Sequence, residues 1–420
     1  MKQIVPWMEN LKIQSPSCKI VANPKSDLSI RSARRLKHAL TLEDFEVIAR
    51  SYLPRAIFGY IAGATETQTS LKDNRRVFDE IAFRAHTLVK VADRTQETTL
   101  FGQKYSAPFG IAPIGFSALL AYRGDITLGR GAMRSNIPMI MSGASLISME
   151  DAIAELPDVW FQAYLTGDEV WIGAFIDRIV NAGIKTLVVT VDMAVVSNRE
   201  HDLRNGFSAP LKPTAKLAID GLLHPGWLTK TFVKTIVKHG MPHFENFGVE
   251  QGPTILSRKL QYGLGGRDHL NWSHVAFIRN RWKGRLILKG IMSVHDARLA
   301  RDAGVDGIIV SNHGGRQLDY LPSPLRVLPD IADAIGGAIP VMIDSGFRRG
   351  TDVLKAIALG ADFVFVGRPF IYAAAVAGEA GVEHAFRLLS SEIHSDMALI
   401  GINKLTEMTK DRLMDFGKYI

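Results

Sequence analysis

The stretch IIVSNHGGRQLDY, residues 308–320, joins a short apolar run to a cluster of polar residues. Ile308, Ile309 and Val310 are β-branched, as is typical of a buried strand. The run ends just before His313, two glycines follow, and Arg316 stands three positions after the histidine. A strand that ends on a histidine and a cation indicates a functional site at its carboxyl end.

Seven further apolar runs of this kind recur along the chain. They are FGIAPIG (109–115), IPMIMSGA (137–144), VWFQAYL (159–165), TLVVTVD (186–192), LILKG (286–290), IPVMIDSG (339–346) and FVFVGRPF (363–370). Helical patterns such as MEDAIAEL and HDARLARDAG lie between most of them. Eight apolar strands that alternate with helices predict an α/β fold, a closed (β/α)₈ TIM barrel. A doubly wound open sheet is the alternative, but the first run ends IAPIGF and lacks the GxGxxG of that fold.

The first 40 residues carry much of the positive charge. They hold eight Lys or Arg residues against Glu9 and Asp27, in a chain whose net charge is +8. Such an arm can meet an anionic lipid or a neighbouring subunit, or remain a solvated extension. No basic surface interleaved with aromatic residues follows it, so we expect no nucleic-acid binding. Thr41 and Asp44 suit a helix N-terminus, so we divide the chain into a basic arm (1–40) and a barrel (41–420).

The rest of the composition bounds the location of the protein. Cys18 is the one cysteine, which excludes a disulfide framework within the chain, and we expect no bound metal. The opening MKQIVPWMEN does not resemble a secretion signal, and no uncharged run is long enough to span a membrane. We therefore expect a cytoplasmic protein that is soluble or lies on a membrane surface.

One connection between strands is far longer than the others. Ninety-four positions separate Asp192 from Leu286, so an excursion of about 205–272 occupies the fourth βα loop, on the face where barrels keep their active sites. Within it Lys230, Lys234 and Lys238 are spaced four apart, which predicts a basic amphipathic helix. A contact with a membrane surface and an ordinary surface helix are both compatible with this pattern.

Polar residues gather where the predicted strands end. Barrel strands are mostly apolar filler, so polar side chains at the end that forms the mouth indicate function. The residues are Gln162 and Tyr164, Thr190, Asp192 and Arg199, Lys289, Ser311, His313 and Arg316, Asp344, and Arg368. Lys289 could form a Schiff base or stabilise a negative charge, while Gln162 and Thr190 suit the edge of a flat heterocycle.

The segments DSGFRRG and VGRPF follow the seventh and eighth strands, where barrels commonly bind phosphate. Gly346, Gly350 and Gly367 allow backbone N–H groups to approach an anion, and Arg348 and Arg368 can pair with its oxygens. Together these residues predict a nucleotide-like cofactor that lies across the mouth.

The motif SNHGGRQLD resembles the signature of the FMN-dependent 2-hydroxy acid dehydrogenases and oxidases. LPRAIFGYIAGA, FGIAPIG, FQAYL, TVD, LILKG, DSGFRRGTDV and GRPF resemble further blocks of that family in the same order, from about Thr41 to Leu413. The resemblance implies FMN as cofactor and the oxidation of an L-2-hydroxy acid to a 2-oxo acid.

The resemblance also implies roles for individual residues. His313 would take a proton from the substrate and Asp192 would hold it, while Lys289 would stabilise the reduced flavin. The substrate would be bound by Tyr60, Tyr164, Arg199 and Arg316. The flavin would be lined by Pro113, Ile114, Gly115, Ser142, Gln162, Thr190 and Ser311, its ribityl chain held by Asp344, and its phosphate held by Gly346, Arg348, Gly367 and Arg368.

The electron acceptor and the substrate are less sharply defined. Family oxidases often have Ala where this chain has Gly115, and the long fourth loop resembles membrane-associated lactate and mandelate dehydrogenases. We therefore expect a dehydrogenase on the inner face of the cell membrane, bound through 205–272, that passes electrons to quinone.

Lactate is the first expected substrate and mandelate the second, with Gly115, Phe116, Ala144 and parts of the excursion beside its side chain. A soluble oxidase that makes hydrogen peroxide is the alternative, and a non-redox flavin isomerase or a non-enzymatic membrane scaffold is more distant. The family implies a homotetramer.

Overall fold

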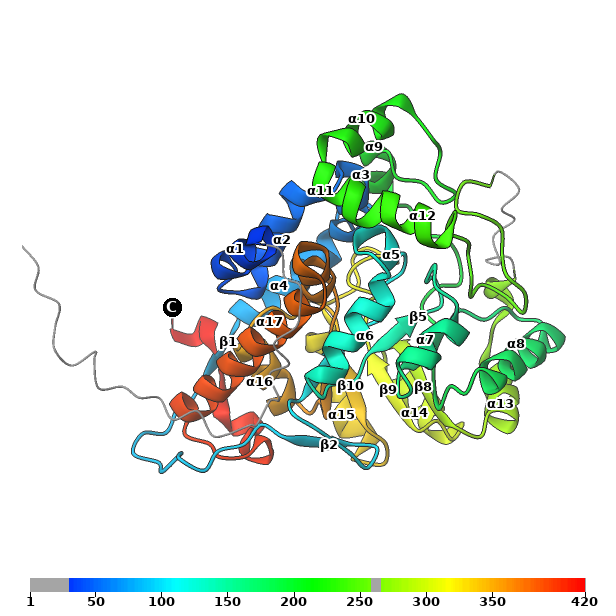
Figure 1. Cartoon of the computed structure of the whole chain (residues 1–420). Helices are drawn as coiled ribbons and strands as arrows, with labels where there is room; N and C mark the ends of the chain where they lie inside the picture. The colour runs from blue at the N-terminus through cyan, green and yellow to red at the C-terminus, as the bar shows by residue number, and fades with distance from the viewer. Residues whose placement is uncertain (1–29, 258–265, 420) are drawn as a thin grey trace, which may run out of the picture.

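The eight predicted strands form one parallel sheet in the computed structural model, which describes residues 30–257 and 266–419 (Figure 1). The strands are β4 (Phe109–Ile111), β5 (Ile140–Ser142), β6 (Trp160–Ala163), β7 (Thr186–Thr190), β8 (Arg285–Ile291), β9 (Gly307–Val310), β10 (Val341–Ile343) and β11 (Phe363–Val366). Their order is β4-β11-β10-β9-β8-β7-β6-β5. A bridge from Ile111 to Met139 links the two end strands, so the sheet comes round on itself and the predicted TIM barrel is confirmed.

Helices follow the strands and form the outer ring. In chain order they are α5 (Ser117–Leu120) with α6 (Gly124–Arg134), α7 (Met149–Glu155), α8 (Glu169–Asn181), α13 (Trp272–Arg281), α14 (Val294–Asp302), α15 (Pro324–Ile335), α16 (Gly350–Ala358) and α17 (Arg368–Ile400). Side-chain caps start several of them: Ser148 accepts from Asp151 N–H, and Asp168 accepts from Val170 and Trp171 N–H. Each such cap contributes about 1 kcal/mol and fixes where the helix begins.

Four helices precede the barrel: α1 (Ile30–His38), α2 (Leu42–Tyr52), α3 (Arg55–Ala62) and α4 (Thr69–Asp79). The predicted helix N-terminus at Thr41 is confirmed, because Thr41 and Asp44 form a reciprocal capping box. Of the basic arm, residues 30–38 form α1, which contacts α17, and residues 1–29 lie outside the described part of the chain. A short antiparallel pair, β1 (Ile81–Phe83) with β12 (Leu413–Asp415), joins the two ends of the domain.

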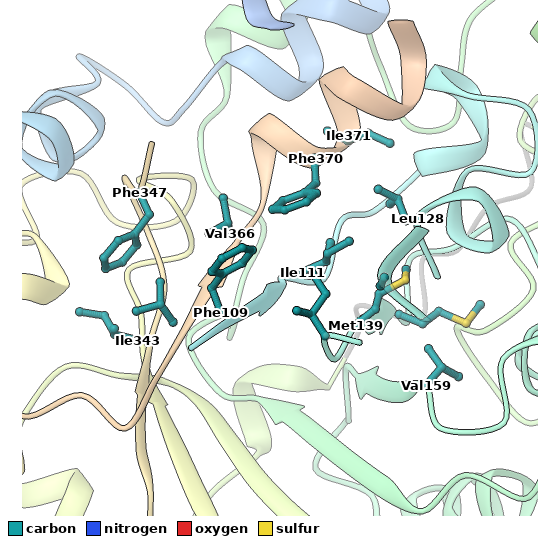
Figure 2. Close-up of a cluster of buried hydrophobic side chains, with 14 of the residues drawn as sticks. Phe109, Ile111, Leu128, Met139, Val159, Ile343, Phe347, Val366, Phe370 and Ile371 are labelled. Atoms are coloured by element: carbon teal, nitrogen blue, oxygen red, sulfur yellow. The ribbon is translucent and has the colours of Figure 1, made fainter. Parts of the chain in front are cut away.

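The apolar core has two parts, one inside and one outside the barrel. Inside, Trp160, Ile287 and Met342 pack together, and the hairpin of β2 (Thr98–Leu100) and β3 (Gln103–Tyr105) adds Leu100 and Tyr105 to this cluster. Outside, the strands pack on the helices. Figure 2 shows Phe109 of β4 and Val366 of β11 beside Phe370 of α17. Both faces of the sheet are therefore covered, which explains the near-continuous apolar strands.

The excursion of the fourth loop folds as a set of helices on one side of the molecule, near α3 (Figure 1). They are α9 (Glu200–Asn205), α10 (Ala215–Leu223), and α11 (Pro225–Trp227), η2 (Leu228–Val233) and α12 (Lys234–His239), which are continuous. The helix predicted around Lys230 is confirmed. Trp227 anchors it, because its buried indole N–H donates to Leu119 O at 2.7 Å. None of the described helices is both long and apolar enough to cross a bilayer.

Candidate functional site

The polar residues of the mouth form a layer directly above the apolar interior of the barrel. Side chains alternate between the two faces of a strand, so residues two apart point the same way. The lower inward positions are Ile140, Trp160, Val188, Ile287, Ile309 and Met342. Two residues on, the same strands or their carboxyl ends carry Ser142, Gln162, Thr190, Lys289, Ser311 and Asp344, all buried. On each of these strands, the inward-facing side chain is therefore apolar at the lower position and polar two residues later.

Lys289 is the buried cation of this layer. Its Nζ lies 2.9 Å from Asp344 Oδ2 and donates to Ser311 Oγ at 2.7 Å. Burial alone would lower the pKa of Lys289, but Asp344 and Asp192 outweigh it and the pKa lies above its usual value. The lysine therefore remains charged at neutral pH and presents a fixed positive group to the mouth.

His313 and Asp192 form a buried pair at the ends of β9 and β7. His313 Nδ1 lies 3.1 Å from Asp192 Oδ1, and the His313 backbone N–H donates to Ser311 Oγ at 3.0 Å. Gly290 makes room for the carboxylate, because a Cβ at this position would lie 2.6 Å from Asp192 Cβ. Burial lowers the pKa of His313 while Asp192 raises it, and the net pKa is below the usual value. The imidazole is therefore neutral at pH 7 and able to accept a proton.

The same pair holds its carboxylate in the charged form. Burial raises the pKa of Asp192, but His313 and Lys289 outweigh this effect and the net pKa is lowered. A carboxylate at the ring nitrogen that faces away from the reaction orients the imidazole and stabilises its cation.

Two arginines lie next to each other on one wall of the mouth. Arg316 Nη1 donates to Tyr60 O at 2.6 Å and to Gly63 O at 2.8 Å, while Arg199 Nε donates to Arg316 O at 3.2 Å. Burial and the neighbouring Arg316 lower the pKa of Arg199. Arg316 Nη2 is buried without a hydrogen-bond partner among the described residues. The wall is therefore suited to an anion with two oxygens.

Two tyrosines complete this wall. The Tyr60 ring lies 4.8 Å from the guanidinium carbon of Arg316 and stacks on Phe207 with ring centroids 4.3 Å apart. Burial raises the pKa of both Tyr60 and Tyr164, so both hydroxyls keep their protons and can donate hydrogen bonds.

A second group of arginines lies at the carboxyl ends of β10 and β11. Arg368 donates to the carbonyls of Ile61, Gly63 and Gly314 at 2.8–3.1 Å, and burial lowers its pKa to about 10. Arg348 is also buried enough for its pKa to be lowered. Neither has a carboxylate partner within 4 Å in the described chain. With Gly367 at the N-terminus of α17, they form the kind of site that holds phosphate.

These groups border one cavity of about 480 Å³. Of the residues predicted to bind cofactor or substrate, most border it: Tyr60, Pro113, Ile114, Gly115, Gln162, Tyr164, Thr190, Arg199, Lys289, His313, Arg316, Asp344, Gly346, Arg348, Gly367 and Arg368. Ser142, Asp192 and Ser311 lie behind this surface, where they bond to Gln162, His313 and Lys289. Gln162 Nε2 and Thr190 Oγ1 are buried without a partner among the described residues. Unpartnered polar atoms of this kind fit the polar edge of a flat cofactor.

Some cavity residues escaped the sequence analysis. Met193, Phe207 and Arg267 border the cavity, as does Asp202, which lies near Arg199 and Arg316. All four belong to the fourth loop. Site residues were predicted from their position at the end of a strand, and residues within a long loop have no such marker. Across residues 30–257 and 266–419, no three His, Cys, Asp or Glu side chains are placed to share a metal ion.

Comparisons with known proteins agree with this arrangement. A family model described as FMN-dependent dehydrogenase matches residues 49–415. The chain is 37% identical to the (S)-mandelate dehydrogenase of Pseudomonas putida over 91% of this chain and 95% of that protein. It is 38% identical to the L-lactate dehydrogenase of Azorhizobium caulinodans, over 88% and 97%.

Solved structures give the same result. The crystal structure of the monotopic membrane protein (S)-mandelate dehydrogenase superposes with a TM-score of 0.80 at 36% identity, covering 90% of this chain and 99% of that one. A mandelate oxidase with benzoyl-formic acid superposes at 0.73 and 33% identity, covering 89% and 98%. The chain therefore belongs to the FMN-dependent 2-hydroxy acid dehydrogenase family, and FMN is its cofactor.

Proposed function

We propose that this enzyme oxidises an L-2-hydroxy acid to its 2-oxo acid on the inner face of the cell membrane and passes the electrons to quinone. The observation that carries the proposal is the His313–Asp192 pair in one cavity with two adjacent arginines, Arg199 and Arg316. A base beside an anion-binding wall is what the oxidation of a hydroxy carboxylate requires, because the bound carboxylate fixes the position of the neighbouring CH(OH) group relative to the base.

FMN, when bound, supplies the acceptor for the two electrons that leave the substrate. Its ring would lie against the segment Pro113–Gly115 and the polar groups of Gln162 and Thr190, while Ser142 and Ser311 hold Gln162 and Lys289 in place. Asp344 would bind the ribityl chain. Gly346, Arg348, Gly367 and Arg368 would bind the phosphate, consistent with the absence of a carboxylate partner for either arginine in the described chain.

The protein groups divide the remaining work. Arg199 and Arg316 bind the substrate carboxylate, and Tyr60 and Tyr164 donate hydrogen bonds to its oxygens. Neutral His313 takes a proton from the substrate, and Asp192 stabilises the imidazolium that results. Lys289, held charged by Asp344, stabilises negative charge that develops on the ring.

The fourth loop supports the membrane location. Its helices expose Leu222, Leu223, Phe232 and Val237, with Lys230, Lys234 and Lys238 on the same helical segment. Apolar side chains flanked by lysines favour a surface of anionic lipid, where each lysine adds about 1 kcal/mol. The relative described as a monotopic membrane protein has the same fold.

The substrate proposal rests on a small set of residues. Gly115, Phe116 and Ala144 border the cavity, and the small side chains of the first and third leave room beside the substrate carbon. Lactate and mandelate are the two candidates, since relatives of nearly equal identity carry both names. A homotetramer is part of the proposal, and light scattering after size exclusion tests it.

A second candidate is a soluble oxidase that reduces oxygen to hydrogen peroxide. It is favoured by one observation, the structural likeness to mandelate oxidases at 31–33% identity.

Anaerobic reduction of the flavin by a panel of L-2-hydroxy acids tests the proposal. Bleaching by one acid, followed by fast reoxidation with a quinone analogue and slow reoxidation in oxygen, is the expected result. Fast reoxidation in oxygen would replace the dehydrogenase with the oxidase. If no acid reduces the flavin, the remaining interpretations would be a non-redox flavin isomerase or a non-enzymatic scaffold.

Co-sedimentation with anionic vesicles tests the membrane contact. Val237→Asp should move the protein from the pellet to the supernatant. Leu399→Asp is the matched control, because Leu399 is equally exposed (74%, against 77% for Val237) but lies on α17. Equal sedimentation of the two variants would contradict the proposed contact surface.

A further inference from the structure

Arg267 is a buried cation that the proposed mechanism does not use. It begins the short helix η3 (Arg267–His269), at the end of the fourth-loop excursion. The loop after β6 holds this point, because Gly167 N–H donates to Gly266 O at 2.7 Å. The residue is 3% exposed and its side chain borders the cavity. A guanidinium so deeply buried needs a reason for being there, because arginine is almost never fully buried unless it is paired.

The protein itself satisfies this guanidinium only in part. Its central carbon lies 4.5 Å from the centroid of the Tyr164 ring, and Nη1 lies 3.5 Å from Met193 Sδ, a weak acceptor. Nε and Nη2 have no hydrogen-bond partner in the described part of the chain. Burial lowers the pKa of Arg267 to about 10, and no carboxylate of the described residues lies within 4 Å of its side chain. The adjoining segment RKLQYGLG (258–265) contains no acidic residue in its sequence.

The other cations of the cavity all have an assigned anion. Lys289 pairs with Asp344, and Arg199 and Arg316 lie near Asp202 and form the wall proposed for the substrate carboxylate. Arg348 and Arg368 form the site proposed for the phosphate. Arg267 is thus left over when every anion of the proposed complex has been placed.

Arg267 contacts the carboxylate wall through the ring of Tyr164. Tyr164 is also close enough to Arg199 to influence the pKa of that arginine. Apolar groups such as Met193 and Phe247 border the same cavity. A ligand held by Arg199 and Arg316 can therefore extend its side chain past these apolar groups toward Arg267, within the same cavity.

We propose that Arg267 binds a second acidic group at the end of the substrate's side chain, so that the preferred substrates are 2-hydroxy acids with two negative charges. This inference rests on the proposed oxidation of 2-hydroxy acids and narrows its substrate class: lactate and mandelate, which carry one negative charge, become poorer substrates than diacids of the same type. A second carboxylate satisfies Nε and Nη2 together, in the bidentate geometry that arginine favours.

The test compares acids matched in shape but not in charge. The probes are (S)-2-hydroxyglutarate with (S)-2-hydroxyhexanoate, and 4-carboxymandelate with 4-methylmandelate. In the holoenzyme, kcat/KM for the diacid of at least one pair should exceed that of its neutral partner by tenfold or more. Arg267→Met should remove this preference by raising KM for the diacid at least tenfold, while the neutral acid is oxidised as before or better. Arg267→Lys should retain part of the preference.

A binding measurement separates recognition from folding. Titration of the oxidised flavin spectrum with 2-oxoglutarate and with 2-oxohexanoate gives dissociation constants without turnover, and only the diacid should bind more weakly to Arg267→Met. Arg281→Met is the control, because Arg281 lies in an exposed ion pair with Asp177 on α13 and α8, and it should change neither constant.

The outcomes distinguish the two proposals. If neutral acids bleach the flavin and Arg267→Met changes both members of each pair equally, the arginine has a structural role and this inference fails alone. If none of the four acids, and neither lactate nor mandelate, bleaches the flavin of the wild-type holoenzyme, the proposed oxidation fails and the inference fails with it. If lactate or mandelate bleaches the flavin but no diacid does, this inference fails alone.

Discussion

The lower and upper layers of the barrel interior are built from the same strands and differ only by a step of two residues. Ile287 lies in the lower layer and Lys289 in the upper, and Met342 and Asp344 repeat the relation on β10. The lower layer is hydrocarbon that excludes water. The upper layer is a network of hydrogen bonds and charges with unpartnered atoms at Gln162 and Thr190. The lower layer therefore stabilises the fold, whereas the upper layer has hydrogen-bonding groups that a bound ligand can satisfy.

The largest expected effect is in the upper region, at His313. His313→Gln removes the proton acceptor, so flavin reduction by substrate should slow by about 10³- to 10⁴-fold while the yellow cofactor remains bound. Stopped-flow reduction measures the rate and the absorbance spectrum measures occupancy. His295→Gln on the surface of α14 should leave the rate unchanged. A rate for His313→Gln within threefold of the wild type would remove its assigned role.

The lower layer should respond in the opposite way. Trp160→Ala opens a cavity against Phe365 and Phe101, so the free energy of unfolding should fall by about 3–5 kcal/mol. Urea unfolding measures the change. The rate of flavin reduction in the folded fraction should stay near that of the wild type, and a large loss of rate with intact stability would break the division between the layers.

The pH dependence of an Asp192 variant tests whether the upper layer carries the proposed proton transfer. The proposed mechanism uses neutral His313, so flavin reduction should fall as the pH drops through the lowered pKa of this residue, below 6.5. Because Asp192 raises the pKa of His313, Asp192→Asn should move this acid limb to lower pH and slow the plateau by about 10²-fold. Reduction rates between pH 4.5 and 8 measure both effects. An acid limb that moves upward would contradict the pairing.

Thr190 should give the smallest effect. Its hydroxyl is buried without a partner among the described residues, so Thr190→Val should leave the stability of the FMN-free protein unchanged or slightly higher. The loss of one hydrogen bond to the flavin should weaken FMN binding by about 1 kcal/mol, which is roughly fivefold. Fluorescence titration of released FMN measures it. A loss of stability in the FMN-free protein would show that the upper layer also supports the fold.

The sequence was sufficient for the barrel because its signal is local and repeated. Each of the eight apolar runs became a strand, and most of the polar residues predicted at their ends border one cavity. The sequence does not show which of these polar residues face the cavity directly and which support them from behind. Nothing in it indicated that Ser142 and Ser311 would lie behind Gln162 and Lys289. Arg267 and Phe207 could not be predicted individually. Their positions depend on how the long loop folds back over the barrel, and a loop has no repeating apolar pattern from which its path can be predicted.

The long loop between β7 and β8 also has a consequence for how the enzyme can change. The two strands pair in uninterrupted parallel register from Thr186 with Arg285 to Thr190 with Lys289, as though a short turn joined them. The entropy of closing a loop grows only with the logarithm of its length, so the barrel is almost indifferent to how many residues lie between. The excursion within this loop, about 205–272, is therefore an exchangeable module: evolution or an engineer can replace the surface proposed to meet the membrane, and with it Arg267, while Asp192, Arg199 and the flavin site are retained.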